Sequence, residues 1–115
     1  MTELDPDHLQ VDKAKITDYL LCTAHPDGNS KATFFARYGF LVEQWQVFAT
    51  ALRVHGMRQE IVRRIDSPFG TKYLVTGRLD TPDGRDPVVR TVWIQEHGQS
   101  SCRLVTAYSY TAERS

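Results

Sequence analysis

Apolar residues follow two different patterns along this 115-residue chain, one in each half. In the first half they recur at the three- and four-residue spacing of a helix, and Trp45, Phe48, Ala49 and Leu52 share one such face. From Met57 onward, apolar and polar residues alternate, which is typical of strands that bury one face. A chain with helices first and strands afterwards is predicted to fold as an α+β domain.

The first half is predicted to contain three helical segments, at 17–21, 30–38 and 42–55. Thr17 is the expected N-cap of the first segment, because its hydroxyl can accept a hydrogen bond from a free backbone N–H of the first turn. Gly39 and Gly56 follow the second and third segments and are expected to end them, since glycine adopts the left-handed conformation without strain.

The second half is predicted to contain four strands, at Arg58–Ile65, Thr71–Leu79, Pro87–Gln95 and Cys102–Tyr110. The short connections between them carry turn-forming residues, which favours consecutive antiparallel neighbours. The fold class is therefore predicted to be two or three N-terminal helices packed on a four-stranded antiparallel β-meander. A single domain is expected over 13–110, with flexible tails at 1–12 and 111–115.

Two of the predicted strands mix polar side chains with apolar ones. Strict alternation places Arg90 beside Val92 on one face of the third strand, and it places Thr106 and Tyr108 beside Leu104 on one face of the fourth. Such a mixed surface is typical of a binding or catalytic site. An arginine that extends from a sheet edge gives the same pattern, so both interpretations stay open at this point.

Charge and composition exclude several classes of protein. The 14 basic residues balance the 14 acidic ones, and a net charge of zero argues against a histone-like polycation. No apolar stretch approaches the roughly 20 residues needed to span a bilayer, so no membrane partner is expected. The acidic and polar segment 1–12 does not match a secretory signal, and the cytoplasm is the predicted location.

The sequence predicts neither a metal nor another cofactor. Its four histidines lack metal-ligand spacing, and no glycine-rich phosphate or dinucleotide motif occurs. Cys22 and Cys102 are interpreted as two reduced thiols, with a long-range disulfide as the alternative.

The most informative local stretch runs from His25 to Lys31, with the sequence His-Pro-Asp-Gly-Asn-Ser-Lys. It joins an imidazole on a Pro/Gly loop to a lysine in the first turn of the following helix. A helix N-terminus attracts an anion such as phosphate, Lys31 would add a full charge, and His25 could exchange a proton near neutral pH. The alternative interpretation is a loop-to-helix connector with a solvated lysine.

Several motifs spread over residues 13–110 resemble those of one family. They are Lys15-Ile-Thr-Asp-Tyr-Leu-Leu21, His25-Pro-Asp-Gly-Asn-Ser-Lys-Ala32 with Phe34-Phe35, Gly39-Phe40, Trp45, Gly70-Thr-Lys-Tyr73, Thr81-Pro-Asp-Gly-Arg85, Val89-Arg-Thr-Val-Trp93 and Arg103-Leu-Val-Thr-Ala-Tyr108. The family consists of small bacterial domains of unknown function, found alone or at the ends of larger toxin-like or phage-like proteins.

The order of elements is also similar to that of the barnase–EndoU–colicin–RelE group of metal-independent ribonucleases. The resemblance implies a catalytic set with His25 and Lys31 from the helical side. From the strands it implies Arg90, Thr106 and Tyr108. In such an endoribonuclease, His25 would act as base or acid, and Lys31 and Arg90 would stabilise the phosphate. Thr106 or Tyr108 would position that phosphate.

Two classes of function are therefore predicted as alternatives. The first is a ribonuclease-like toxin domain that cleaves RNA by acid–base chemistry and is neutralised by a small partner protein. The second is a non-catalytic protein-interaction domain, including an antitoxin or immunity-like partner, that uses the exposed sheet face. Three aromatic residues could either stack on an RNA base or fill the core, namely Tyr73, Trp93 and Tyr110.

Overall fold

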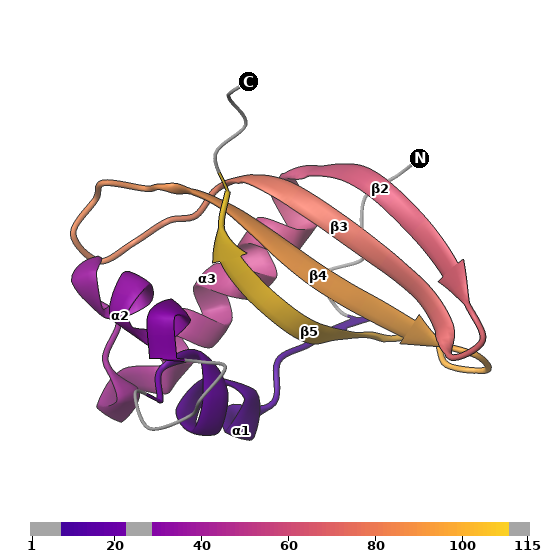
Figure 1. Cartoon of the computed structure of the whole chain (residues 1–115), viewed down its shortest axis with the longest axis horizontal. Coiled ribbons are helices and arrows are strands. Elements are labelled where there is room, and N and C mark those ends of the chain that lie inside the picture. Colours follow the sequence, from indigo (N-terminus) through magenta and orange to yellow (C-terminus); the bar gives the residue numbers. More distant parts are fainter. Residues whose placement is uncertain (1–7, 23–28, 111–115) are drawn as a thin grey trace.

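A layer of helices packs on one face of a twisted sheet in the computed structural model, which describes residues 8–22 and 29–110 (Figure 1). The helical layer consists of α1 (Lys13–Lys15), the π-helical turn η2 (Ile16–Leu20), α2 (Asn29–Arg37), the 3-10 turn η3 (Val42–Gln44) and α3 (Trp45–Arg58). Helix α3 lies behind the strands in the view of Figure 1. Among the described helices, none has the length and apolar character needed to cross a membrane.

The sheet has five strands rather than the four predicted. They are β1 (Leu9–Gln10), β2 (Glu60–Ser67), β3 (Gly70–Arg78), β4 (Val88–Glu96) and β5 (Cys102–Ser109), in the spatial order β1-β5-β4-β3-β2. Strands β2 to β5 form the predicted antiparallel meander, and β1 adds a parallel edge. Leu9 and Gln10 lie in the segment for which a tail was expected, but they form β1, and Leu9 is buried in the core. The α+β class is confirmed, and the sheet is mixed.

The core lies between α3 and the sheet. Phe48 and Leu52 of α3 are fully buried, as are Trp93 and Val75 on the strands they cover. Phe48 also lies 4.7 Å from the ring of Phe35 on α2, measured between centroids, so the two longer helices share one aromatic cluster. This burial of large side chains supplies most of the force that holds the helices on the sheet.

Two helix boundaries differ from the predicted ones. The first helical segment begins at Lys13, so Thr17 lies inside it and is not its N-cap. Helix α3 continues through Gly56 to Arg58. A Cβ atom at Gly56 would lie 2.7 Å from Cζ2 of Trp93, so glycine is needed there for the close approach of helix and sheet. Gly39 does follow α2 with a φ of 103°, as predicted.

A β-bulge in β5 changes which side chains share a face. Thr106 pairs with Val92, but Leu104 pairs with Trp93, which leaves Val105 as the extra residue. The strict alternation assumed from the sequence is therefore wrong across this point. Leu104 faces the core, whereas Thr106 and Tyr108 face the side of the sheet that carries no helix.

Candidate functional site

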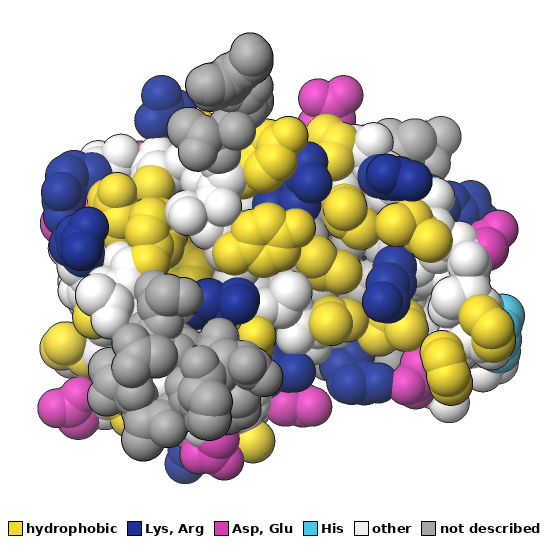
Figure 2. All heavy atoms as spheres, in the orientation of Figure 1, with side chains coloured by type: hydrophobic (Ala, Val, Ile, Leu, Met, Phe, Trp, Pro, Cys, Tyr) yellow, Lys and Arg dark blue, Asp and Glu magenta, His cyan; other side chains and the backbone are white. Residues whose placement is uncertain are grey.

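The face of the sheet that carries no helix gathers most of the polar strand residues. The register places on it Lys72, Leu74 and Thr76 of β3, Arg90, Val92 and Ile94 of β4, and Arg103, Thr106 and Tyr108 of β5. We call this surface the open face. Figure 2 shows hydrophobic side chains in a band across it, with Lys and Arg among them and Asp and Glu toward the rim. Such a surface offers cations for an anion and flat apolar area for stacking.

Arg90 is held in place at this surface by two neighbours. Its Nε donates a hydrogen bond to Oγ1 of Thr76 over 2.9 Å. Its guanidinium carbon lies 4.0 Å from the centroid of the Tyr110 ring, a cation–π contact. The two Nη atoms make no hydrogen bond with another described residue. A guanidinium fixed in this way keeps a forked pair of donors ready for a phosphate or carboxylate.

Thr106 lies diagonally across from Arg90. Tyr108 is the cross-strand partner of Arg90, and Thr106 is that of Val92, so all three predicted strand residues share the open face. Diagonal neighbours in a sheet typically lie about 7–8 Å apart. Oγ1 of Thr106 is buried and has no hydrogen-bond partner among the described residues. An unpartnered hydroxyl of this kind costs about 1–3 kcal/mol, which a ligand atom could recover.

Of the two helical-side residues of the predicted site, the structure describes Lys31. Lys31 lies in the first turn of α2, and its ammonium is 5.6 Å from the centroid of the Tyr19 ring. Lys15 approaches the same ring at 5.3 Å. Helix α2 packs against β5, the strand that carries Thr106 and Tyr108. His25 lies outside the described residues. The structure thus brings together Arg90, Thr106 and Tyr108, with Lys31 on the neighbouring helix.

A buried network around His55 was not predicted from the sequence. Nε2 of His55 lies 3.0 Å from the carbonyl of Gly77 and 2.9 Å from that of Val89, so it must carry the proton. Nδ1 then accepts a hydrogen bond from the Thr91 hydroxyl over 3.0 Å. The indole N–H of Trp93 donates to the same hydroxyl over 2.9 Å.

Every polar atom of this network has a partner, and the network lies in the core beneath the sheet. Burial lowers the pKa of His55, and the hydrogen bonds to the two carbonyls oppose that shift only in part. His55 is therefore a neutral structural group. A lone histidine on the apolar face of a helix carries no sequence signal that would separate this role from a catalytic one.

The three aromatic residues considered for stacking lie in different surroundings. Trp93 is fully buried in the core, so its stacking role is excluded. Tyr73 packs against the core, and its hydroxyl donates to Oε1 of Gln95 over 3.4 Å. Tyr110 lies at the open face under Arg90, where it positions a cation. Its role and that of Thr76 depend on cross-strand register, which period-two alternation alone does not give.

Neither cysteine forms a disulfide in the structure. Cys22 is half-buried and Cys102 is buried, and both are free thiols. Burial raises the pKa of the Cys102 thiol, which keeps it protonated and unreactive. Within the described ranges, no group of three His, Cys, Asp or Glu side chains is arranged to hold a metal ion.

Comparison with known proteins gives a family and a fold neighbour. The family model described as Domain of unknown function (DUF6883) matches residues 4–111. The fold is similar to that of a chain in a contact-dependent growth inhibition toxin–immunity protein complex from Klebsiella pneumoniae 342, with a TM-score of 0.71 and 21% sequence identity. The match covers 87% of this chain and 98% of that chain. A search of curated proteins finds no match.

Proposed function

We propose that this chain, which belongs to the family described as Domain of unknown function (DUF6883), is a metal-independent ribonuclease-like toxin domain that binds RNA on its open face. One observation carries the proposal. Arg90 is held by Thr76 and Tyr110 with its Nη atoms unused by the described residues, and the unpartnered hydroxyl of Thr106 lies diagonally beside it. This is the arrangement that an anionic oxygen would complete.

The chemistry of RNA cleavage without a metal fits these residue types. The 2′-oxygen attacks the phosphorus while a base removes its proton, and the bond from phosphorus to the 5′-oxygen breaks as an acid protonates that oxygen. Negative charge grows on the phosphorane oxygens during this step. The Arg90 guanidinium would stabilise that charge, and the Thr106 hydroxyl would donate to one of the oxygens. Tyr108 would hold the phosphate in register.

The acid and base would come from the helical side. His25 is proposed to exchange the proton, and Lys31 is proposed to add charge at the phosphate. Helix α2 packs against β5, the strand that carries Thr106 and Tyr108, and the assignment requires Lys31 and His25 to reach past β5 to the open face. The described histidine in the core, His55, has both ring nitrogens occupied and is not available for this role.

The fold likeness supports the toxin part of the proposal. The neighbouring structure is a complex of a growth inhibition toxin with its immunity protein, and a small neutralising protein is proposed for this chain by analogy. A non-catalytic interaction domain, such as an immunity-like protein, is the alternative. The half-buried Leu74 on the open face would serve such a domain, but a fixed arginine with open donors is better suited to a phosphate.

Controlled expression in a bacterial host tests the proposal. Cells would carry the wild type, His25→Ala, Lys31→Ala, Arg90→Ala or Arg64→Ala, and growth and total RNA would be followed after induction. Arg64 is the matched control, because it is an exposed arginine whose guanidinium lies over the Tyr73 ring, on the face of the sheet opposite the open face. We expect growth arrest with new RNA ends for the wild type and Arg64→Ala, and relief in the other three variants at equal soluble expression.

Two results would count against the ribonuclease. Normal growth and intact RNA at high expression of the wild type would favour the interaction domain. Growth arrest that persists in Arg90→Ala would show that the open face is not the site. A filter-binding series with increasing salt adds a second test, because phosphate contacts made by Arg and Lys predict a steep fall in RNA affinity.

A further inference from the structure

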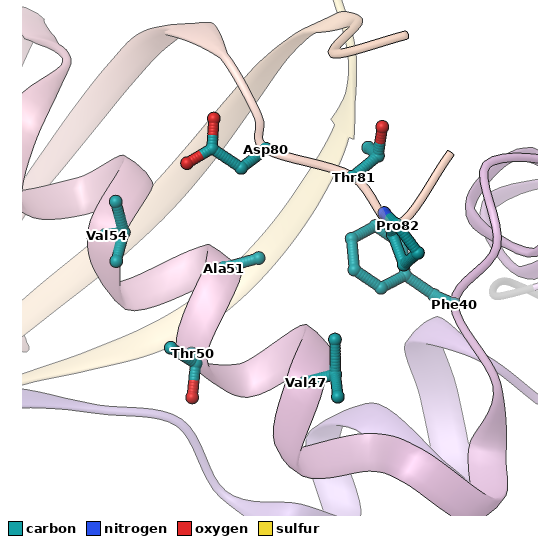
Figure 3. Close-up of a pocket in the computed structure, with 8 residues that line it drawn as sticks. All are labelled: Phe40, Val47, Thr50, Ala51, Val54, Asp80, Thr81 and Pro82. Carbon is teal, nitrogen blue, oxygen red and sulfur yellow. The ribbon is translucent and has the colours of Figure 1, made fainter. Parts of the chain in front are cut away.

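Helix α3 carries a second apolar stripe that begins at the core and extends to the surface. Phe48 and Leu52 point into the core and are fully buried. Val47, Ala51 and Val54 recur four and three positions apart along the helix, so they share a different side. That side faces the connection between β3 and β4 (Figure 3). Ala51 belongs to the core, Val54 is half-buried and Val47 is exposed, so apolar surface continues from the core to the outside of the helix.

A pocket of about 300 Å³ lies along this second stripe. Its helix wall is lined by Val47, Thr50, Ala51 and Val54, and its other wall by Phe40, Asp80, Thr81 and Pro82. Figure 3 shows Phe40 and Pro82 together at one end of this pocket. We call this feature the α3 groove.

The loop that forms the outer wall of the groove is fastened to the end of α2. The backbone N–H of Asp83 donates to the carbonyl of Tyr38 over 3.3 Å. Nη2 of Arg85 donates to the carbonyl of Arg37 over 2.8 Å, and the same guanidinium lies 4.5 Å from the Tyr38 ring centroid. Because these contacts fix the wall, the groove is a preformed feature of the fold.

Exposed apolar side chains continue from the groove toward the start of α3. Val47 is 48% exposed, and Leu41 and Val42, just before it in the chain, are 49% and 44% exposed. These three account for half of the large exposed hydrophobic side chains among the described residues, the others being Val62, Phe69 and Val88. Such a concentration at one place marks an interaction surface better than scattered single residues do.

The groove has an acidic rim. Asp80 lines it, and Glu43 lies one helical turn before Val47. Both residues are exposed, and neither carboxylate forms a hydrogen bond or ion pair with any other residue that the structure describes. A symmetric contact between two copies of the groove would bring like carboxylates together, which argues against self-association through it. A cation from a different protein would meet complementary charge there.

We infer that the α3 groove is a docking site for a partner protein that inserts an apolar side chain flanked by Lys or Arg. The apolar anchor would fill the space between Val47, Val54 and Pro82, and the cation would pair with Asp80 or Glu43. The groove lies on the helical side of the domain, away from the open face, so this inference does not depend on the ribonuclease proposal.

Selection of random peptides displayed on phage tests the inference on the intact chain. We expect the enriched peptides to carry an apolar residue next to Lys or Arg. Their affinity should fall by about tenfold or more with Val47→Asp and with Asp80→Lys, because each variant removes one half of the recognition. Val62→Asp is the matched control, since Val62 is a valine of nearly equal exposure, 46%, that does not line the groove. Thermal melting is the control that checks whether all three variants fold.

Several outcomes would overturn the inference. They are the absence of enriched peptides, enriched peptides that are acidic, and enriched peptides whose binding withstands both Val47→Asp and Asp80→Lys. A further outcome that would overturn the inference concerns the oligomeric state, which light scattering measures. A wild-type dimer that Val47→Asp converts to a monomer, while Val62→Asp does not, would make a second copy of this chain the occupant.

Discussion

Replacing Thr91 with valine is expected to destabilise the domain far more than the small change in side-chain size suggests. Valine has nearly the same shape, so the substitution leaves no cavity and keeps the strand propensity of the position. It removes one hydroxyl that serves two buried partners. Nδ1 of His55 loses the donor that lies 3.0 Å away, and the indole N–H of Trp93 loses the acceptor 2.9 Å away.

The magnitude follows from these two lost contacts. A buried polar atom left without a partner costs about 1–3 kcal/mol, so two such atoms give a loss of about 2–4 kcal/mol when some relaxation is allowed. An unfolding entropy of about 2.1 cal/mol/K per residue amounts to roughly 0.24 kcal/mol/K for this chain. Each kcal/mol therefore lowers Tm by about 4 °C, and Thr91→Val is expected to lower it by about 8–16 °C.

The same substitution at Thr106 provides the control. The Thr106 hydroxyl is buried without a partner, so Thr106→Val removes an unsatisfied group and is expected to leave stability unchanged or to raise it by about 1 kcal/mol. Urea unfolding followed by tryptophan fluorescence measures both variants, and an unchanged slope confirms that the unfolding remains comparable. Equal losses in Thr91→Val and Thr106→Val, or a loss below about 1 kcal/mol in Thr91→Val, would refute the described network.

Other predictions concern the same region of the core. Because burial lowers the pKa of His55 below its ordinary value of 6.5, the unfolded chain binds a proton more readily than the folded one, so stability is full above pH 6.5 and falls as the pH drops below it. Urea unfolding on either side of this pH measures the loss, which should shrink in His55→Gln. Gly56→Ala should cost about 1–3 kcal/mol by overpacking against Trp93, although alanine is the better helix former. Thermal melting that shows a stabilised Gly56→Ala variant would contradict the close helix–sheet approach.

The sequence predicted the strands well because their pattern is local. Alternating side chains and turn residues placed β2 to β5 within a few residues of their observed bounds. Strand β1 was not predicted, since two residues are too few to show any alternation. Gly56 was read as a helix end because its local chemistry allows one, whereas the contact that requires glycine is made by Trp93, far away in the chain.

The sequence suggests which residue types the candidate site would use, but it does not give the geometry that places them together. Resemblance implies Arg90, Thr106 and Tyr108 as site residues, and strict alternation along β5 predicts Thr106 on the face of Leu104. The bulge at Val105 reverses that placement and brings Thr106 and Tyr108 to the side of Arg90. A bulge depends on the pairing of two strands, so one strand's pattern does not reveal it. The support of Arg90 by Thr76 and Tyr110 depends on the same pairing.

Cleavage of RNA by the purified chain is the measurement that tests the central claim most directly. Wild type, Arg90→Ala, Thr106→Val and the control Arg64→Ala would be incubated with RNA in the presence of a metal chelator. We predict that the wild type and Arg64→Ala produce new RNA ends, that Arg90→Ala is slower by about a hundredfold or more, and that Thr106→Val is slower while it remains fully folded. Intact RNA with the wild type, or undiminished cleavage by Arg90→Ala, would contradict the assignment of a ribonuclease site to the open face.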